Sequence, residues 1–327
     1  MSNFEEVKKD SALKENELRP LNFKDYIGQD HIKEELIVSI KASEIRKKPL
    51  QHMLFSGSPG LGKTTLAAII SAEKGSKLHI TSAPIIEKPS DLASLLMSLE
   101  EGDILFIDEI HALNIKVEES LYSVLEDFKF DVNIESGGTN KLIRLDIEPF
   151  TLIGATTKPG SLSQPLRDRL PISHNLKFYT DDELSSIIKR TSKIIDVEIE
   201  DDAAMEISRR SRSTARIANN LLTRVSSYAI VADSKITFEL ANKSLTKMDI
   251  DKIGLSSSDR NYIDCLYFNL ENKPSGIKTI SSYINEDERT IENIIEPFLI
   301  QKGLLSKTQR GRTLTKKGID YAKNIPK

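Results

Sequence analysis

Residues 57–64 read GSPGLGKT and have the spacing G-x-x-x-x-G-K-[ST] of a phosphate-binding loop. Gly60 and Gly62 would let backbone N–H groups curl around phosphate oxygens, and a helix N-terminus would add partial positive charge. Lys63 would contact the terminal phosphates, and the Thr64 hydroxyl would hold Mg²⁺. A short apolar run precedes the loop and apolar residues at helical spacing follow it. This strand–loop–helix context favours a nucleotide site over an ordinary glycine-rich turn.

Two carboxylates end a second apolar run. Residues 104–107 predict a buried strand, and Asp108 and Glu109 follow it directly. Asp108 could orient Mg²⁺ through water, and Glu109 could polarise the water that attacks a phosphate. The alternative is a solvated acidic strand end. With a phosphate loop upstream, the pair indicates hydrolysis and not only binding.

Three further polar residues could complete such a site. Thr157 ends the next apolar strand, where its hydroxyl could sense a γ-phosphate or fix the water, unless it is an ordinary strand terminus. Arg169 stands twelve residues after Thr157 and could reach a neighbouring subunit's γ-phosphate or form surface salt bridges. Arg216, at the start of a helix, could reach the nucleotide of its own chain or be solvated.

Composition sets the frame for this chemistry. The chain has 327 residues, 46 Lys+Arg and 49 Asp+Glu, a net charge of −3, and 39% hydrophobic residues, which predicts two or three soluble domains. The single Cys265 allows no intrachain disulfide, and the five scattered histidines make zinc chemistry improbable. Without a signal peptide or a membrane-length apolar run, we expect a cytoplasmic protein. Residues 1–17 are polar, and we expect them to be a flexible segment.

Periodicity predicts an α/β domain over residues 18–179. Strand and helix patterns alternate, and the strands are apolar on both faces, which indicates a mostly parallel sheet covered by helices. Residues 127–149 break this order. Alternating apolar residues on both sides of Ser136-Gly137-Gly138-Thr139 predict an inserted β-hairpin.

Two smaller domains are predicted after the sheet. A capping box at residues 180–183 opens an all-α domain over 180–250. Residues 251–327 give helices and a short strand–turn–strand, which suggests a winged helix whose second apolar helix has a core face at 291, 294 and 295. Residues 300–327 carry eight basic side chains against one acidic, a net of +7, which suits phosphate contacts unless it is only a solvated tail.

These motifs, in this order, resemble AAA+ ATPases, and the chain resembles the RuvB family of bacterial Holliday-junction branch-migration motors more closely. The resemblance covers about residues 18–320. The stretches that carry it are Arg19-Pro20, DYIGQ at 25–29, DEIH at 108–111, EDF at 126–128, IGATT at 153–157, PLRDR at 165–169, RIAN at 216–219 and EPFLIQ at 296–301.

The resemblance implies roles for individual residues. Asp108 and Glu109 would be the Walker B pair, Thr157 sensor 1, Arg169 a finger acting in trans, and Arg216 sensor 2. An adenine pocket is implied at Leu18, Arg19, Tyr26 and Ile27, with Tyr179 from the lid side. The nucleotide site as a whole would comprise Leu18, Arg19, Tyr26, Ile27, Gly60, Gly62, Lys63, Thr64, Thr65, Glu126, Asp127, Phe128, Tyr179 and Arg216, with ATP and Mg²⁺ bound and the metal held by Thr64 and Asp108.

The same resemblance implies partners. The hairpin at 127–149 would bind RuvA, the junction-recognition protein, through Val132 and Ile134, unless these residues pack on the core. The chain would form a homohexamer and act with RuvC in a resolvasome. Double-stranded DNA would contact the winged helix at Arg289, Lys307, Arg310 and Arg312.

Several residues depart from the family pattern. Ala112 replaces an arginine, Leu170-Pro171 replaces Phe-Gly after the finger, and Ser213 and Ala215 replace Gly and Pro before Arg216. Lys307 stands where arginine is usual and therefore lacks a bidentate fork.

The function expected from these residues is an ATP-driven motor that migrates Holliday junctions in recombination and DNA repair. Two alternatives remain open. One is an ATP-switched AAA+ clamp loader or initiator-like protein, which would bind DNA without continuous translocation. The other is a winged-helix regulator whose nucleotide domain only gates assembly, and Glu109 argues against it because a pure switch needs no water-polarising acid.

Overall fold

The computed structural model describes residues 17–136 and 139–324, without the side chains of residues 132–142. The predicted flexible segment therefore lies outside the described residues except for Glu17. Two units pack separately, one formed by the residues up to Ile187 with Thr214–Arg216, the other by Ile188–Ser213 with Ile217 onward. Within the described part, no helix has the length and apolar character needed to span a membrane.

The first unit contains a five-stranded parallel sheet in the order β2-β3-β6-β1-β7. Its strands are β1 (Met53–Ser56), β2 (Leu78–Ser82), β3 (Ile104–Asp108), β6 (Thr151–Thr156) and β7 (Ile172–Asn175). Because parallel strands end at one edge, the phosphate loop after β1, the carboxylates after β3 and Thr157 after β6 share that edge. The predicted parallel sheet is confirmed.

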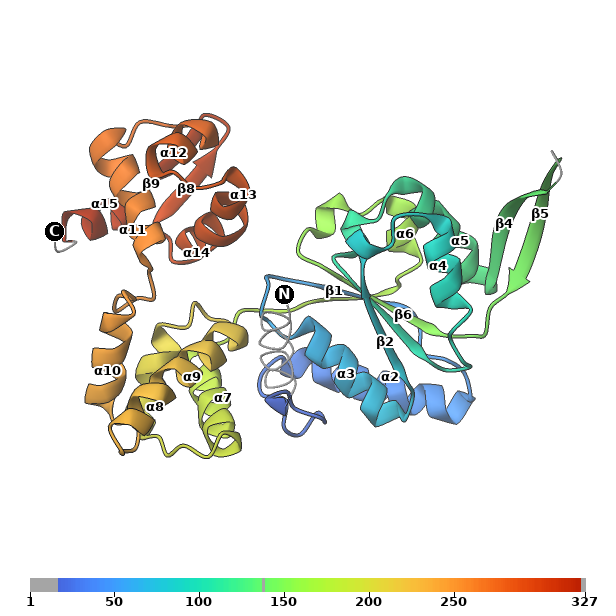
Figure 1. The fold of residues 1–327 in the computed structure, drawn as a ribbon, viewed down its shortest axis with the longest axis horizontal. Helices are drawn as coiled ribbons and strands as arrows, with labels where there is room; N and C mark the ends of the chain where they lie inside the picture. The colour runs from blue at the N-terminus through green and yellow to red at the C-terminus, as the bar shows by residue number, and fades with distance from the viewer. Residues whose placement is uncertain (1–16, 137–138, 325–327) are drawn as a thin grey trace. The chain divides into compact units, whose positions relative to one another are not determined.

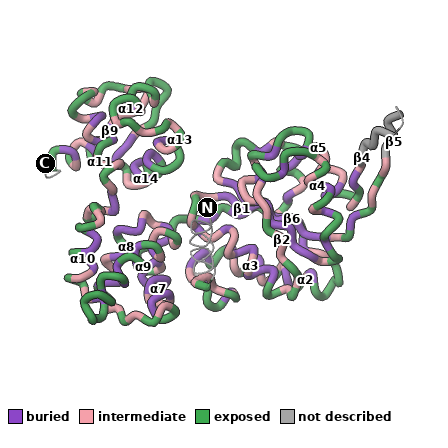
Figure 2. Tube along the Cα trace, viewed as in Figure 1, coloured by how far each residue is buried: buried purple, intermediate pink, exposed green. Residues whose placement is uncertain are grey.

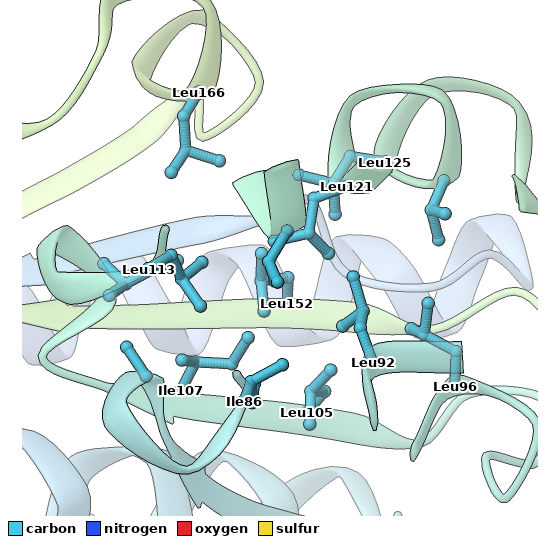
Figure 3. Close-up of a cluster of buried hydrophobic side chains, with 14 of the residues drawn as sticks. Ile86, Leu92, Leu96, Leu105, Ile107, Leu113, Leu121, Leu125, Leu152 and Leu166 are labelled. Atoms are coloured by element: carbon cyan, nitrogen blue, oxygen red, sulfur yellow. The ribbon is translucent and has the colours of Figure 1, made fainter. Parts of the chain in front are cut away.

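Helices cover both faces of this sheet, with α2 and α3 on one side and α4, α5 and α6 on the other (Figure 1). The elements are α2 (Asp30–Arg46), α3 (Lys63–Lys74), η1 (Ala83–Ile85), α4 (Pro89–Leu96), η2 (Ile110–Ala112), α5 (Ile115–Asp127), η3 (Pro159–Ser161) and α6 (Gln164–Asp168). The inner strands β1 and β6 are buried throughout their length (Figure 2). Leu92 of α4 and Leu121 of α5 pack with Leu105 of β3 in the core between this helix layer and the sheet (Figure 3). Each such leucine contributes about 1.5–3 kcal/mol when fully buried.

The inserted hairpin pairs β4 (Lys129–Ser136) with β5 (Thr139–Asp146) in antiparallel register and projects from the sheet domain (Figure 1). Its root belongs to the core, because Phe130 is buried and Leu145 packs against the same cluster. The root of the hairpin is therefore part of the core of the sheet domain. The side chains of Val132 and Ile134 lie outside the described residues, so their assignment to RuvA stays a prediction.

Four helices form the lid: α7 (Asp181–Ile194), α8 (Asp201–Arg209), α9 (Ala215–Val231) and α10 (Phe238–Lys247). The predicted capping box is present at the start of α7. Thr180 N–H donates to Glu183 Oε2 at 2.7 Å, and Glu183 N–H donates to Thr180 Oγ1 at 3.2 Å.

The C-terminal domain is a winged helix. Its elements are α11 (Ser257–Asp264), η4 (Cys265–Asn269), α12 (Ile277–Ile284), α13 (Glu288–Thr290), η5 (Ile291–Ile295), α14 (Glu296–Gln301), β8 (Leu305–Thr308), β9 (Gly311–Leu314) and α15 (Lys316–Lys323). Ile291 and Ile295 are buried in its core as predicted, but Ile294 is 57% exposed. The reason is that Ile291–Ile295 form a π-helical turn, in which positions four apart share a face and the position three along turns away from it. Strands β8 and β9 form the wing.

A buried histidine makes the sheet domain sensitive to acid. His52 Nδ1 accepts a hydrogen bond from Leu152 N–H at 2.9 Å, and Nε2 lies 3.1 Å from the Leu125 carbonyl, so a neutral ring protonated on Nε2 satisfies both partners. Burial lowers the pKa of His52 below its usual value, although the Leu125 hydrogen bond opposes this. Below about pH 6.5 the unfolded chain therefore binds a proton that the folded chain does not.

We expect acid to lower the free energy of unfolding by up to about 1.4 kcal/mol per pH unit for this one group, starting near pH 6.5. Thermal unfolding between pH 7.5 and 5.5 at constant ionic strength measures the effect. His52→Gln should flatten the pH dependence but not remove it, because burial also lowers the pKa of His174. An unchanged slope in His52→Gln contradicts the assignment.

Candidate active site

The phosphate loop has the backbone of an anion cradle. Gly57, Gly60 and Gly62 have φ of 140°, 80° and 98°, in the region that favours glycine. A Cβ on Gly62 would lie 2.9 Å from Tyr26 Oη, and one on Gly60 would lie 3.0 Å from Arg216 Cβ. These glycines are therefore required both by the backbone and by close neighbours.

Lys63 begins α3 and is buried inside the loop. Its ammonium donates to the carbonyls of Gly57 at 2.7 Å and Ser58 at 3.2 Å. Burial lowers the pKa of Lys63, while Glu109 and Asp108 raise it and Arg216 lowers it further. Lys63 therefore interacts electrostatically with Asp108, Glu109 and Arg216, the residues that the sequence assigned to the same reaction site.

Glu109 is held by the neighbouring strand end. Its Oε2 accepts hydrogen bonds from Thr157 N–H at 3.2 Å and Thr157 Oγ1 at 3.0 Å. Glu109 itself has a φ of 49°, a left-handed conformation that costs a non-glycine residue about 1–2 kcal/mol. The structure therefore brings together the predicted water-polarising acid and the predicted sensor, 48 residues apart.

His111 is a site residue that the sequence reasoning did not assign. Its Nδ1 lies 3.1 Å from Glu109 Oε2 and 2.9 Å from Thr156 Oγ1. The available signal was its position two residues after Glu109, within a short helical turn that folds the ring back onto the carboxylate. His111 and Thr157 together restrict the orientation of Glu109.

Arg216 lies at the phosphate loop. Its backbone N–H donates to the Gly60 carbonyl at 3.4 Å, and Thr214 is the other neighbour of Gly60. Arg212 and Ser213, just before this segment, have φ of 52° and 56°. Ser213 therefore occupies a left-handed position where the family pattern has glycine, at a cost of about 1–2 kcal/mol. The chain departs from the pattern, yet α9 still starts beside the loop.

Two buried tyrosines flank the loop on the predicted adenine side. Tyr179 Oη donates to the Leu61 carbonyl at 3.1 Å and lies 3.3 Å from Tyr26 Oη, with which it is hydrogen-bonded. Burial raises the pKa of Tyr26 and of Tyr179, so both stay neutral. Leu18, Arg19 and Ile27 are half-buried in the segment around Tyr26. The same loop region is therefore lined by residues from the start and the end of the sheet domain.

Arg169, at the end of α6, is held by residues of its own chain on α5 and α6. Its guanidinium pairs with Glu126 Oε1 at 2.8 Å, donates to the carbonyls of Tyr122 and Pro165, and stacks 4.8 Å from the Tyr122 ring centroid. The ion pair matches the interpretation of Arg169 as a salt-bridged arginine. The 21% exposure of its side chain also leaves it accessible to a neighbouring subunit, as the finger interpretation requires.

Residues 126–128 are not placed with the phosphate loop of their own chain. Phe128 packs against His52 and Phe150, at the edge where β1 and β6 begin. The phosphate loop follows the opposite end of β1. Glu126 pairs instead with Arg169, the predicted finger.

The four predicted DNA-contacting residues lie on the winged helix with different surroundings. Arg289, on α13, and Arg310, in the turn of the wing, are exposed. Lys307 and Arg312, on the two strands of the wing, form ion pairs with Glu292 and Glu296. The net charge of residues 300–327 omitted these two carboxylates.

Family models cover almost the whole chain. The Holliday junction DNA helicase RuvB P-loop domain matches residues 18–176, the RuvB AAA lid domain matches 179–251, and the RuvB C-terminal winged helix domain matches 252–323. This chain belongs to the RuvB family. The predicted fold class is thereby confirmed: a parallel-sheet AAA+ domain, a helical lid and a winged helix.

Relatives and solved structures agree with this RuvB assignment. The chain is 48% identical over 309 residues to the RuvB subunit of the Holliday junction branch migration complex from Fusobacterium nucleatum, covering 94% of this chain and 93% of the relative. It is also 48% identical over 305 residues to the Pseudothermotoga lettingae RuvB, covering 93% and 88%. The Thermotoga maritima RuvB branch migration motor superposes with a TM-score of 0.86 at 42% identity, covering 95% of this chain and 100% of that one.

Proposed function

We propose that this chain hydrolyses ATP and, as a ring recruited by RuvA, moves Holliday junctions along double-stranded DNA in recombination and repair. The observation that carries the proposal is the Glu109 carboxylate, which Thr157 holds by two hydrogen bonds at the edge where β3 and β6 end. This carboxylate interacts electrostatically with Lys63 of the phosphate loop, and the chain belongs to the RuvB family. The partner RuvC, the homohexamer and the bacterial cytoplasm belong to the same proposal and follow from the family.

The residues at the loop fit ATP with Mg²⁺. The Thr64 hydroxyl and the Asp108 carboxylate are half-buried at the shared strand edge, and oxygen donors are the ligands that Mg²⁺ prefers. When bound, the ion would neutralise charge on the phosphate oxygens. Glu109 polarises the attacking water, and Thr157 and His111 fix the direction of its carboxylate. Lys63 and Arg216 offset the negative charge that develops at the γ-phosphate.

A four-way DNA junction tests this function. With ATP, Mg²⁺ and the cognate RuvA, the protein should convert a synthetic junction into two duplexes, and it should fail with a non-hydrolysable ATP analogue. Normal ATP hydrolysis without junction conversion would overturn the motor assignment and favour the clamp-loader alternative.

The hairpin supplies the matched variant for this assay. Val132→Asp places a charge on a predicted RuvA contact and should abolish RuvA-dependent conversion while ATPase activity without RuvA stays unchanged, because β4 and β5 project from the sheet domain (Figure 1). Arg144→Ala serves as the control, since it removes only the exposed ion pair with Asp131 on the same hairpin. Equal RuvA binding by wild type and Val132→Asp, measured by gel filtration, would show that RuvA contacts a surface that does not include Val132.

A further inference from the structure

The wing of the C-terminal domain neutralises two of its own cations. Lys307 Nζ lies 3.3 Å from Glu292 Oε1 and 3.2 Å from Glu296 Oε2. Arg312 donates from Nε to Glu296 Oε1 at 2.7 Å and from Nη2 to Glu292 Oε1 at 3.1 Å. Two positive and two negative charges therefore form one closed cluster on the surface assigned to DNA.

The two carboxylates of this cluster differ in burial. Glu296 is 1% exposed and also accepts a hydrogen bond from Tyr262 Oη at 3.1 Å. Its carboxylate is therefore held in place, and it positions the guanidinium of Arg312. Glu292 stands one helical turn earlier on the same face, and its side chain is 48% exposed. Glu296 is thus a structural anchor, whereas Glu292 lies at the rim and can move.

The rim position of Glu292 affects how DNA meets the wing. The Lys307 side chain is 45% exposed and is the accessible cation of the cluster, since that of Arg312 is only 11% exposed. A phosphate that contacts Lys307 Nζ encounters the Glu292 carboxylate, which is bound to the same nitrogen. Glu292 and Glu296 both already pair with Lys307 Nζ, so a phosphate that approaches this nitrogen is repelled by both carboxylates. Displacement of Glu292, the exposed one of the two, lowers this repulsion.

We propose that Glu292 is an internal competitor of DNA phosphate for Lys307 and Arg312, and that it limits how tightly the wing binds duplex DNA. The inference rests on the proposed function, in which the wing contacts DNA. Since the cluster is neutral before binding, Lys307 contributes to affinity only after the exchange. This arrangement suits a motor that must release each stretch of duplex after moving it.

Arg310 provides the contrast within the same wing. It lies exposed in the turn between β8 and β9, and among the described side chains, those of residues 17–131 and 143–324, no carboxylate pairs with its guanidinium. Its charge is available to phosphate without any exchange. The competitor hypothesis therefore predicts opposite effects on DNA affinity for removal of Arg310 and removal of Glu292.

Binding of the full-length protein to a fluorescent duplex, measured by anisotropy at several salt concentrations, tests the proposal. Glu292→Gln should raise affinity about 3- to 10-fold at 0.1 M salt and steepen the slope of log K against log [salt] by up to about 1, because Lys307 then acts as a free counter-charge. Arg310→Ala should lower affinity and make the slope shallower. Glu101→Gln, an exposed carboxylate of the sheet domain, controls for the change in net charge.

Two additions keep the result interpretable. Glu292→Ala removes the same charge without the amide, and thermal unfolding confirms that each variant is folded. In a Lys307→Ala background, Glu292→Gln should gain much less affinity, because the accessible one of the two competed cations is gone and Arg312 is only 11% exposed. If Arg310→Ala and Lys307→Ala weaken binding but Glu292→Gln does not strengthen it, the competitor role is wrong and the DNA-binding wing stands. If none of the wing variants changes binding, the wing does not contact DNA, and both its assignment to DNA and the competitor role of Glu292 are wrong.

Discussion

Glu109→Gln is expected to lower ATP turnover at least ~100-fold while ATP binding stays close to wild type. The amide has nearly the shape of the carboxylate and can still accept from Thr157 N–H and Oγ1. It cannot draw a proton from water at neutral pH, so the attacking water loses its base. The phosphate loop and Lys63 are untouched, and they supply the contacts on which binding depends.

Turnover is measured as phosphate release at saturating ATP, and binding by competition with a fluorescent nucleotide. Glu119→Gln, an exposed carboxylate on α5, is the matched control and should keep wild-type turnover. A turnover within a few-fold of wild type in Glu109→Gln would show that another group polarises the water. A parallel loss of nucleotide binding would place Glu109 in binding and not in chemistry.

The sheet and its reactive edge could be read from the sequence because buried parallel strands are continuous apolar runs. β3 and β6 were visible for this reason, and the polar residues at their ends fell on one edge by topology alone. β2 was not predicted, because it is the edge strand and its residues are only partly buried, with Ile80 57% exposed. An edge strand needs no second apolar face, and so it leaves no apolar run.

Side-chain partners across the fold were harder to predict. The Glu126–Arg169 ion pair joins residues 43 positions apart and depends on how α5 and α6 pack. His111 reaches Glu109 through a left-handed backbone at Glu109, a conformation that its residue type does not suggest. Glu292 and Glu296 could have been foreseen as one face of a helix, four residues apart, but their placement against the wing depends on tertiary packing. The charge count of the tail therefore overstated its free positive charge.

Arg169→Ala is expected to lower ATPase activity of the assembled ring about 10³-fold or more, if its guanidinium completes the site of a neighbouring subunit. The side chain is held by Glu126 and the Tyr122 carbonyl of α5 and by the Pro165 carbonyl of α6, which fixes its position at the surface of the sheet domain. Arg167→Ala is the matched control. Arg167 is two residues away and exposed, and its guanidinium bonds to the Pro159 carbonyl.

Mixing two inactive variants distinguishes action in trans from a structural role. Arg169→Ala subunits keep Glu109, and Glu109→Gln subunits keep Arg169, so an equal mixture restores complete sites only where a subunit of the first kind receives an arginine from one of the second. Random assembly completes about a quarter of the interfaces, and activity should recover toward that fraction if sites act independently. A side chain that only stabilised its own subunit through Glu126 could not be complemented in this way. Without recovery in rings shown to contain both variants, Arg169 is confined to its own subunit.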